Sequence, residues 1–199
     1  MKFKKFLGLS IIILLIFIIY IFNIDKKVYY VNISDDKTIY NVYVKKELEK
    51  NSKLEKYVNI KDQDYRVTDL INDIDNNKVI NNNDQTIQNV LIKADILTLK
   101  IGNNELDYKA NTKDINELFE YSDDLLNDIE KLFKIIRLYD KEEIYFLSFH
   151  NDKNEYYNEI YSYLNLKIKD LCDEYDINLI DISDLKNEEI ANNILQLKK

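Results

Sequence analysis

The residues best placed to do chemistry in this chain are Gly102, Asn104 and Glu105, which directly follow an apolar run at residues 95–101. That run predicts a buried strand, and open α/β sheets bind ligands beyond the carboxyl ends of their strands. Gly102 is one of only two glycines in the chain, and the other, Gly8, lies in an apolar N-terminal segment. Because glycine adopts conformations that other residues avoid, this turn is the first candidate for a functional site.

Short apolar runs that alternate with helical patterns supply the elements that would position this turn. The expected strands are residues 28–33, 57–60, 95–101, 143–149 and 177–182. The expected helices are residues 38–50, 66–74, 86–93, 114–139, 155–175 and 188–197. This alternation favours five parallel strands with right-handed crossovers and helices on both faces. We therefore expect a three-layer α/β/α domain whose functional edge collects the residues that follow each strand.

The first 27 residues are expected to form a membrane anchor, and residues 28–199 one domain. Phe6 to Phe22 is a run of seventeen uncharged residues, which as a helix would be about 25 Å long and could span a bilayer. No small-residue cleavage site follows this run, which disfavours a cleavable signal peptide. Lysines flank both of its ends; we favour the N-terminus inside and the domain outside the cytoplasm.

Composition limits the kinds of partner that the domain can have. The first 27 residues hold five lysines and one aspartate, so the remainder carries 23 basic and 35 acidic residues, a net charge of −12. That charge disfavours nucleic acid and anionic lipid headgroups as ligands. The single cysteine, Cys172, rules out an internal disulfide and a cysteine-built zinc site. Abundant Asn, Ile, Lys and Tyr indicate a low-GC genome, as in low-GC bacteria.

The Gly102 turn resembles the third sequence block of the SGNH (GDSL-type) hydrolases, in which a glycine, one further residue, an asparagine and an acid follow the third strand. Residues 64–74 (DYRVTDLINDI) also resemble the stretch after that family's second strand. The resemblance implies a flavodoxin-like three-layer fold and ester hydrolysis. It further implies that Gly102 lets the backbone approach a substrate and that the Asn104 side chain donates to an oxyanion, with Glu105 at the usual aspartate.

The chain departs from the family at the positions that carry the reaction. Residues 34–36 read Ser-Asp-Asp, so Asp35 matches the family while Asp36 stands where the nucleophilic serine belongs. A carboxylate cannot be activated as an alkoxide. Asp64 stands at the second block's glycine, where its negative charge would oppose an oxyanion. The last block offers Asp181 or Asp184 but no histidine, so two of three triad members are missing.

Two substitute sites can be formulated from the remaining residues. Ser34 and the only histidine, His150, both follow strands and could form a displaced nucleophile–base pair. The alternative is that Ser34 is a turn or capping residue and His150 an ordinary polar residue at a strand end. Acidic side chains at the same edge could bind Ca²⁺ or Mg²⁺, although solvated loops are the better explanation in a chain so rich in acids. These acids are Asp35, Asp36, Asp64, Glu105 and Asp181.

The sequence thus predicts a membrane-anchored, extracytoplasmic SGNH-hydrolase-like domain that has lost catalysis and needs no cofactor or metal. Such a pseudoenzyme would bind a partner protein, or an acyl or glycan ligand, in its residual cleft. The alternative is a cell-envelope esterase that uses Ser34 and His150. A purely structural interaction domain is a third class, and it differs from the first only in leaving the cleft unused.

Overall fold

A parallel five-stranded sheet forms the centre of the computed structural model, which describes residues 27–35, 39–61, 65–81, 84–140, 142–150 and 157–196. The strands lie in the order β2-β1-β3-β4-β5, and every neighbouring pair is parallel. This order is that of flavodoxin-like folds and confirms the expected sheet. The strand bounds are β1 Val28–Ser34, β2 Leu54–Lys61, β3 Ile96–Lys100, β4 Glu143–Leu147 and β5 Asn178–Ile180.

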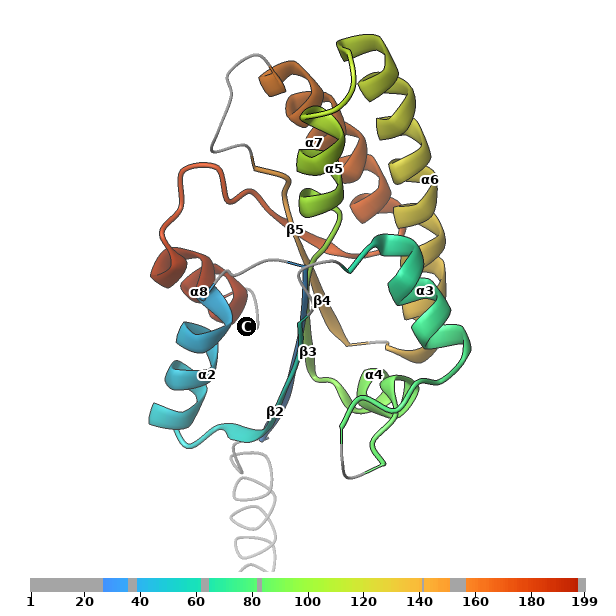
Figure 1. The fold of residues 1–199 in the computed structure, drawn as a ribbon. Helices are drawn as coiled ribbons and strands as arrows, with labels where there is room; N and C mark the ends of the chain where they lie inside the picture. The colour runs from blue at the N-terminus through green and yellow to red at the C-terminus, as the bar shows by residue number, and fades with distance from the viewer. Residues whose placement is uncertain are drawn as a thin grey trace, which may run out of the picture.

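Helices cover both faces of the sheet, so the domain has three layers (Figure 1). One face carries α2 (Tyr40–Lys50) and α8 (Asn187–Gln196). The opposite face carries α3 (Val67–Asp75), α4 (Ile87–Lys93), α6 (Ile115–Tyr139) and α7 (Asn158–Glu174). One further helix, α5 (Asn103–Ala110), begins directly beyond the carboxyl end of β3.

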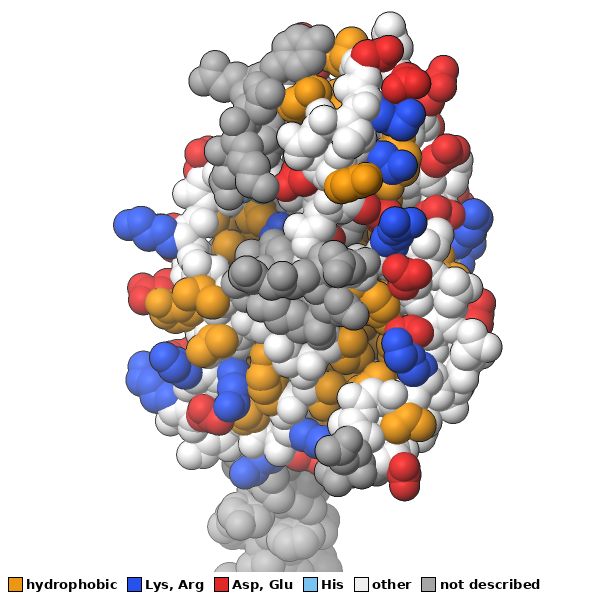
Figure 2. Space-filling view, in the orientation of Figure 1, with side chains coloured by type: hydrophobic (Ala, Val, Ile, Leu, Met, Phe, Trp, Pro, Cys, Tyr) orange, Lys and Arg blue, Asp and Glu red, His pale blue; other side chains and the backbone are white. Residues whose placement is uncertain are grey.

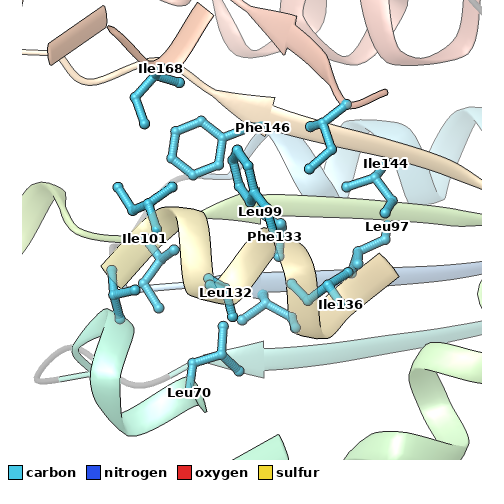
Figure 3. Packing of buried hydrophobic residues seen from close by; sticks show 14 of the residues in the cluster. Leu70, Leu97, Leu99, Ile101, Leu132, Phe133, Ile136, Ile144, Phe146 and Ile168 are labelled. Carbon is cyan, nitrogen blue, oxygen red and sulfur yellow. The ribbon is translucent and has the colours of Figure 1, made fainter. Parts of the chain in front are cut away.

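The alternation of side chains along the strands separates two cores. Successive residues of a strand point to opposite faces, so Tyr29, Val31 and Ile33 enter the larger core while Val28 and Tyr30 enter the smaller one. The larger core is closed by the apolar stripe of α6. Figure 3 shows this contact, in which the rings of Phe133 from α6 and Phe146 from β4 meet edge to face at 5.4 Å between centroids.

The structure differs from the sequence-based expectation chiefly at α5. A turn was expected after β3, but residues 103–110 form a helix of two turns. Only Leu106 and Ala110 supply an apolar stripe, so the local sequence pattern does not predict a helix. Hydrogen bonds from the amino end of this helix to the Asp35 carboxylate support it instead. The other expected helices are present, with bounds that shift by a few residues.

The expected membrane anchor lies outside the described residues. Among the residues that the structure does describe, no helix is long and apolar enough to cross a membrane. The segment from Phe6 to Phe22 precedes the first described residue, Lys27, so this finding does not apply to it.

Candidate functional site

Asp35 is the centre of the hydrogen-bond network at the carboxyl edge of the sheet. It follows β1 directly, is fully buried, and its N–H donates to the carbonyl of Lys100 at 2.9 Å. Its carboxylate Oδ2 accepts from the N–H of Gly102 at 2.8 Å and from the N–H of Asn104 at 3.2 Å. The carboxylate therefore caps the positive amino end of α5, where it stabilises a helix with little apolar pattern of its own.

Gly102 is required at this position by backbone geometry. Its φ of +96° lies in the left-handed region, which side chains with a Cβ rarely adopt. A Cβ built at this position would lie 3.2 Å from Cε1 of Phe149 and 3.4 Å from Cδ1 of Leu125. The glycine that the sequence singled out therefore turns the chain from β3 into α5 through a space in which a Cβ would push the Phe149 and Leu125 side chains back by a few tenths of an ångström.

The two asparagines of the turn connect α5 to the ends of neighbouring strands. The side-chain amide of Asn104 donates to the main-chain carbonyl of Asp35, beyond β1. The side-chain oxygen of Asn103 accepts from the N–H of His150, beyond β4, at 2.9 Å. The amide that the family resemblance assigns to an oxyanion therefore contacts the protein's own backbone.

Glu105 extends the same set of contacts to α3 and α6. Its carboxylate accepts from the N–H of Val67, the first residue of α3, at 3.2 Å, and from the Tyr121 hydroxyl of α6 at 2.9 Å. Burial raises the pKa of Glu105, while the bonds from Val67 and Tyr121 and the nearby Arg66 charge oppose that rise. Each polar residue of the 102–105 turn thus reaches a different part of the fold.

Ser34 and His150 belong to strands that are not adjacent in the sheet. Ser34 pairs with Lys100 on β3, and β4 lies on the far side of β3. The backbones of β1 and β4 are therefore about 9.6 Å apart, two strand spacings. His150 also lies three residues beyond Leu147, the last residue of β4. Ser34 ends β1 and His150 lies beyond β4, so the sheet alone does not bring the two residues together, and a displaced Ser34–His150 pair stays a prediction.

His150 instead lies near Asp181, which follows β5. The Asp181 carboxylate accepts from the Ser183 hydroxyl at 2.6 Å, the Ser183 N–H at 3.0 Å and the Ser148 hydroxyl at 3.2 Å. These bonds hold the pKa of Asp181 below its ordinary value, and the neighbouring His150 contributes in the same direction. Sequence reasoning missed Ser148 and Ser183, because neither matches a family position.

Lys100 is a second residue that sequence reasoning missed. It ends β3 with 4% of its surface exposed, beside Ser34, which is 2% exposed. Alternation along β1 and β3 places both side chains on the α2–α8 face of the sheet. A lysine closing the apolar run ILTLK was the available signal, since lysines are seldom buried without a partner.

A buried network of polar side chains lies on that same face. The side-chain oxygen of Asn32 accepts from the Tyr40 hydroxyl at 2.6 Å and from the Thr98 hydroxyl at 2.8 Å. Its amide donates to Asn59 at 2.7 Å, and the Tyr30 and Thr98 hydroxyls are 3.1 Å apart. These bonds satisfy polar groups that would be costly to bury alone, and they fix α2 against three strands.

Three of the proposed acidic ligands can be placed and two cannot. Asp35, Glu105 and Asp181 each accept hydrogen bonds from the protein, as described above. Asp36 and Asp64, the residues at the family's serine and second glycine, lie outside the described residues. Within the described part of the chain, no group of three or more His, Cys, Asp and Glu side chains is arranged to hold a metal ion.

A hollow of about 450 Å³ opens beside Asn104 and Glu105, on the side away from Ser34. It lies between the amino end of α3, α5 and α6, and we call it the α3–α5–α6 hollow. It is lined by Tyr65, Arg66, Thr68, Asn104, Glu105, Tyr108, Lys109, Tyr121 and Asp128. Its size is within the range of small-molecule sites. The candidate motif therefore borders a space that could receive a ligand.

Comparison with known proteins finds relatives by structure only. No family model matches the sequence, and no curated protein sequence matches it. The fold matches the lipase Lip_vut3 from a goat rumen metagenome with a TM-score of 0.60 and 18% identity, over 77% of this chain and 80% of that one. It matches Axe2, an acetylxylan esterase from Geobacillus stearothermophilus, with a TM-score of 0.60 and 15% identity, over 87% and 82%.

A third structure, the acetyl xylan esterase AlAXEase, has a TM-score of 0.56 and 12% identity, over 85% of this chain and 83% of that one. At these identities the likeness is one of fold. A lipase and acetylxylan esterases with the same arrangement of elements support the resemblance to SGNH-type hydrolases that the Gly102 turn indicated. The domain is therefore hydrolase-like in architecture, and its own residues decide what it can do.

Proposed function

We propose that this chain is a membrane-anchored, extracytoplasmic SGNH-hydrolase-like domain that binds a ligand without hydrolysing it. One observation carries the proposal: the side-chain amide of Asn104, the donor that the family resemblance assigns to an oxyanion, donates to the main-chain carbonyl of Asp35. Donors that would stabilise an oxyanion must point at the place where its charge develops. Here the amide points at the protein's own backbone.

The sequence supports the loss of catalysis independently. Asp36 stands at the serine position, and no histidine follows Asp181 in the last block. Removing the nucleophile and the base leaves at most the weak catalysis that binding and polarisation supply. The fold, by contrast, is intact, with Asp35, Gly102 and Asn104 supporting α5 and the sheet edge. A fold retained without its reactive groups suits a binding role.

Anchoring and location follow from the N-terminal segment. Its seventeen uncharged residues are long enough to span a bilayer, and the domain's net charge of −12 suits a soluble body beside a membrane. We place the domain on the extracytoplasmic side, where a partner protein or an acyl or glycan component of the cell envelope could reach it. Acetylxylan esterases among the structural relatives act, by their names, on an acylated glycan.

The test is a search for a reactive serine in the full chain, reconstituted in lipid nanodiscs. A fluorophosphonate probe should not label the protein, and p-nitrophenyl acetate should be hydrolysed no faster than in nanodiscs without the protein. An active serine esterase, treated identically, confirms that the probe works. Labelling of the wild type that disappears in the Ser34→Ala variant would establish a nucleophile and overturn the proposal.

A divergent esterase is the second candidate function, and the position of His150 near Asp181 favours it. The Asp181 carboxylate lies within electrostatic reach of the His150 imidazole and could orient it as in a triad, and the Ser183 hydroxyl contacts the same carboxylate. Probe labelling that needs His150 and either Ser34 or Ser183 would support this candidate. Parallel Ser34→Ala, Ser183→Ala and His150→Ala variants identify which residue is responsible.

A further inference from the structure

The α3–α5–α6 hollow has a lining that distinguishes between the ligand classes left open above. None of its nine lining residues is aliphatic; three are tyrosines and the other six are polar or charged. An acyl chain gains its binding energy by burying methylene groups against apolar side chains, and in this lining the apolar surface comes from tyrosine rings rather than aliphatic side chains. The hollow therefore suits a polar ligand that also has a flat apolar surface.

The charges of the lining balance. Arg66 and Lys109 contribute two positive charges, and Glu105 and Asp128 contribute two negative charges. An anionic ligand would face the two carboxylates, and a cationic ligand would face the guanidinium and the ammonium group. A neutral ligand with many hydroxyl groups meets neither difficulty. Each hydroxyl can both donate and accept, so it can use both the basic donors and the carboxylate acceptors.

Two of the three tyrosine rings are held in place by their hydroxyl groups. The Tyr65 hydroxyl donates to Asp73 at 2.5 Å, and the Tyr121 hydroxyl donates to Glu105 at 2.9 Å. Rings fixed in this way lose little further freedom when a ligand binds. These two side chains therefore provide preformed walls, with their polar ends already satisfied.

Tyr108 is the exposed wall of the hollow. It lies on α5 with 66% of its surface exposed, although a large aromatic side chain gains from burial. Figure 2 shows this face, where hydrophobic, basic and acidic side chains lie close together over α5, α6 and the amino end of α3. An exposed ring next to paired donors and acceptors offers a stacking surface for one face of a sugar ring.

We infer that the α3–α5–α6 hollow binds a neutral sugar ring, as part of a glycan whose hydroxyls contact Arg66 and Glu105 while its C–H face lies on Tyr108. The inference rests on the proposed binding function and selects its ligand class. Its volume of about 450 Å³ accommodates one or two sugar units rather than a folded protein segment.

The experiment measures binding to the full chain in lipid nanodiscs, because detergents with sugar headgroups would compete for the site. Saturation-transfer NMR is recorded with four probes: cellotetraose, xylotetraose, tetra-galacturonate and octanoate. The two neutral tetrasaccharides should bind, and tetra-galacturonate and octanoate should not. The Tyr108→Ala variant should bind the neutral sugars at least tenfold more weakly.

Two further variants make the test specific. Leu166→Ala removes another exposed apolar side chain, 63% exposed on α7, and should leave sugar binding unchanged. Asp128→Asn makes the lining positive by one charge and should improve binding of tetra-galacturonate relative to cellotetraose. If neither neutral sugar binds, or if both bind Tyr108→Ala as well as wild type, the inference is wrong.

Failure of this inference can be separated from failure of the proposed function. Octanoate binding without sugar binding would overturn the glycan assignment and leave a non-catalytic binding domain in place. Serine labelling by the fluorophosphonate probe would overturn the non-catalytic proposal whether or not sugars bind. Sugar binding that Tyr108→Ala abolishes, together with absence of labelling, would support both.

Discussion

The Asp35 carboxylate accepts a hydrogen bond from the Gly102 N–H at 2.8 Å, although 67 positions of sequence separate the two residues. The same oxygen accepts from the Asn104 N–H at 3.2 Å. These bonds join the end of β1 to the start of α5 in a site closed to solvent. Asp35, which matches the family motif in sequence, therefore also stabilises the fold.

Replacing Asp35 by Asn should destabilise the domain by about 1–3 kcal/mol, because a charge-assisted acceptor at a helix amino end becomes a neutral one. Urea denaturation of the full chain in detergent, followed by circular dichroism, measures the change. Asp114 is the matched control, since its exposed carboxylate accepts from two backbone N–H groups at the start of α6. Asp114→Asn should cost under about 1 kcal/mol, and equal losses at both sites would contradict this account.

Replacing Gly102 by Ala should cost about 2–4 kcal/mol. The left-handed φ of +96° alone costs an alanine about 1–2 kcal/mol, and the Cβ contact 3.2 Å from the Phe149 ring adds to it. Asn111→Ala, at the other end of α5 with a φ of −82°, should stay within about 1 kcal/mol of wild type. A Gly102→Ala variant as stable as wild type would show that α5 can start without this geometry.

Replacing Tyr40 by Phe should cost about 1–2 kcal/mol, because it removes the hydroxyl that donates to Asn32 at 2.6 Å inside the buried network. Asn32 would keep its bond from Thr98, so the network should loosen rather than collapse. Tyr163→Phe is the control, since its hydroxyl bonds Asp123 in solvent. Denaturation midpoints that fall equally in the two variants would mean that the buried network adds nothing.

Asp140 should make stability depend on pH. It is 1% exposed at the end of α6, and its Oδ2 has no hydrogen-bond partner among the described residues. Burial raises the pKa of Asp140 to about 7; the hydrogen bond from the Glu142 N–H and the Arg137 charge oppose the rise, while the carboxylates of Glu142 and Asp95 add to it. The folded state therefore holds this proton more tightly than the unfolded state, whose value is near 4.

The sign of the effect follows from that difference. Below pH 4 the group favours folding fully, and its contribution is lost as pH rises from about 4 to 7, by roughly 2–4 kcal/mol. Asp140→Asn cannot ionise, so its stability should change less over this range and should exceed that of wild type at pH 8. Urea denaturation at pH 5, 6, 7 and 8 tests this. Parallel curves for the two proteins would show that Asp140 does not titrate as described.

The sheet could be predicted from sequence because apolar runs and helical stripes are local signals. All five strands follow from short apolar runs. Six of the seven described helices follow from apolar residues at helical spacing, such as Leu118, Leu125 and Ile129 in α6. The exception, α5, depends on Asp35, which comes from a distant part of the chain. The sequence of residues 102–110 alone does not indicate that this carboxylate will stabilise the start of the helix.

The candidate site could be predicted only in part, for the same reason. Gly102 and Asn104 were identified by a short motif, and the structure places them together with Asp35. The hollow beside them was not predicted, because Tyr65, Tyr108 and Tyr121 come from three segments that meet only when α3, α5 and α6 assemble. The displaced Ser34–His150 pair stays a prediction, since Ser34 ends β1 and His150 lies beyond β4, a strand that is not adjacent to β1.

The position of β1 between β2 and β3 has a consequence for how the chain is made. Domains begin to fold from their amino-terminal side during synthesis. Residues 28–61, which form β1 and β2, emerge before Gly102 and Asn104, whose N–H groups bind the Asp35 carboxylate. Until then the carboxyl end of β1 lacks these two bonds and its pairing with β3. The edge that borders the α3–α5–α6 hollow is therefore completed only when β3 and the start of α5 join the first two strands.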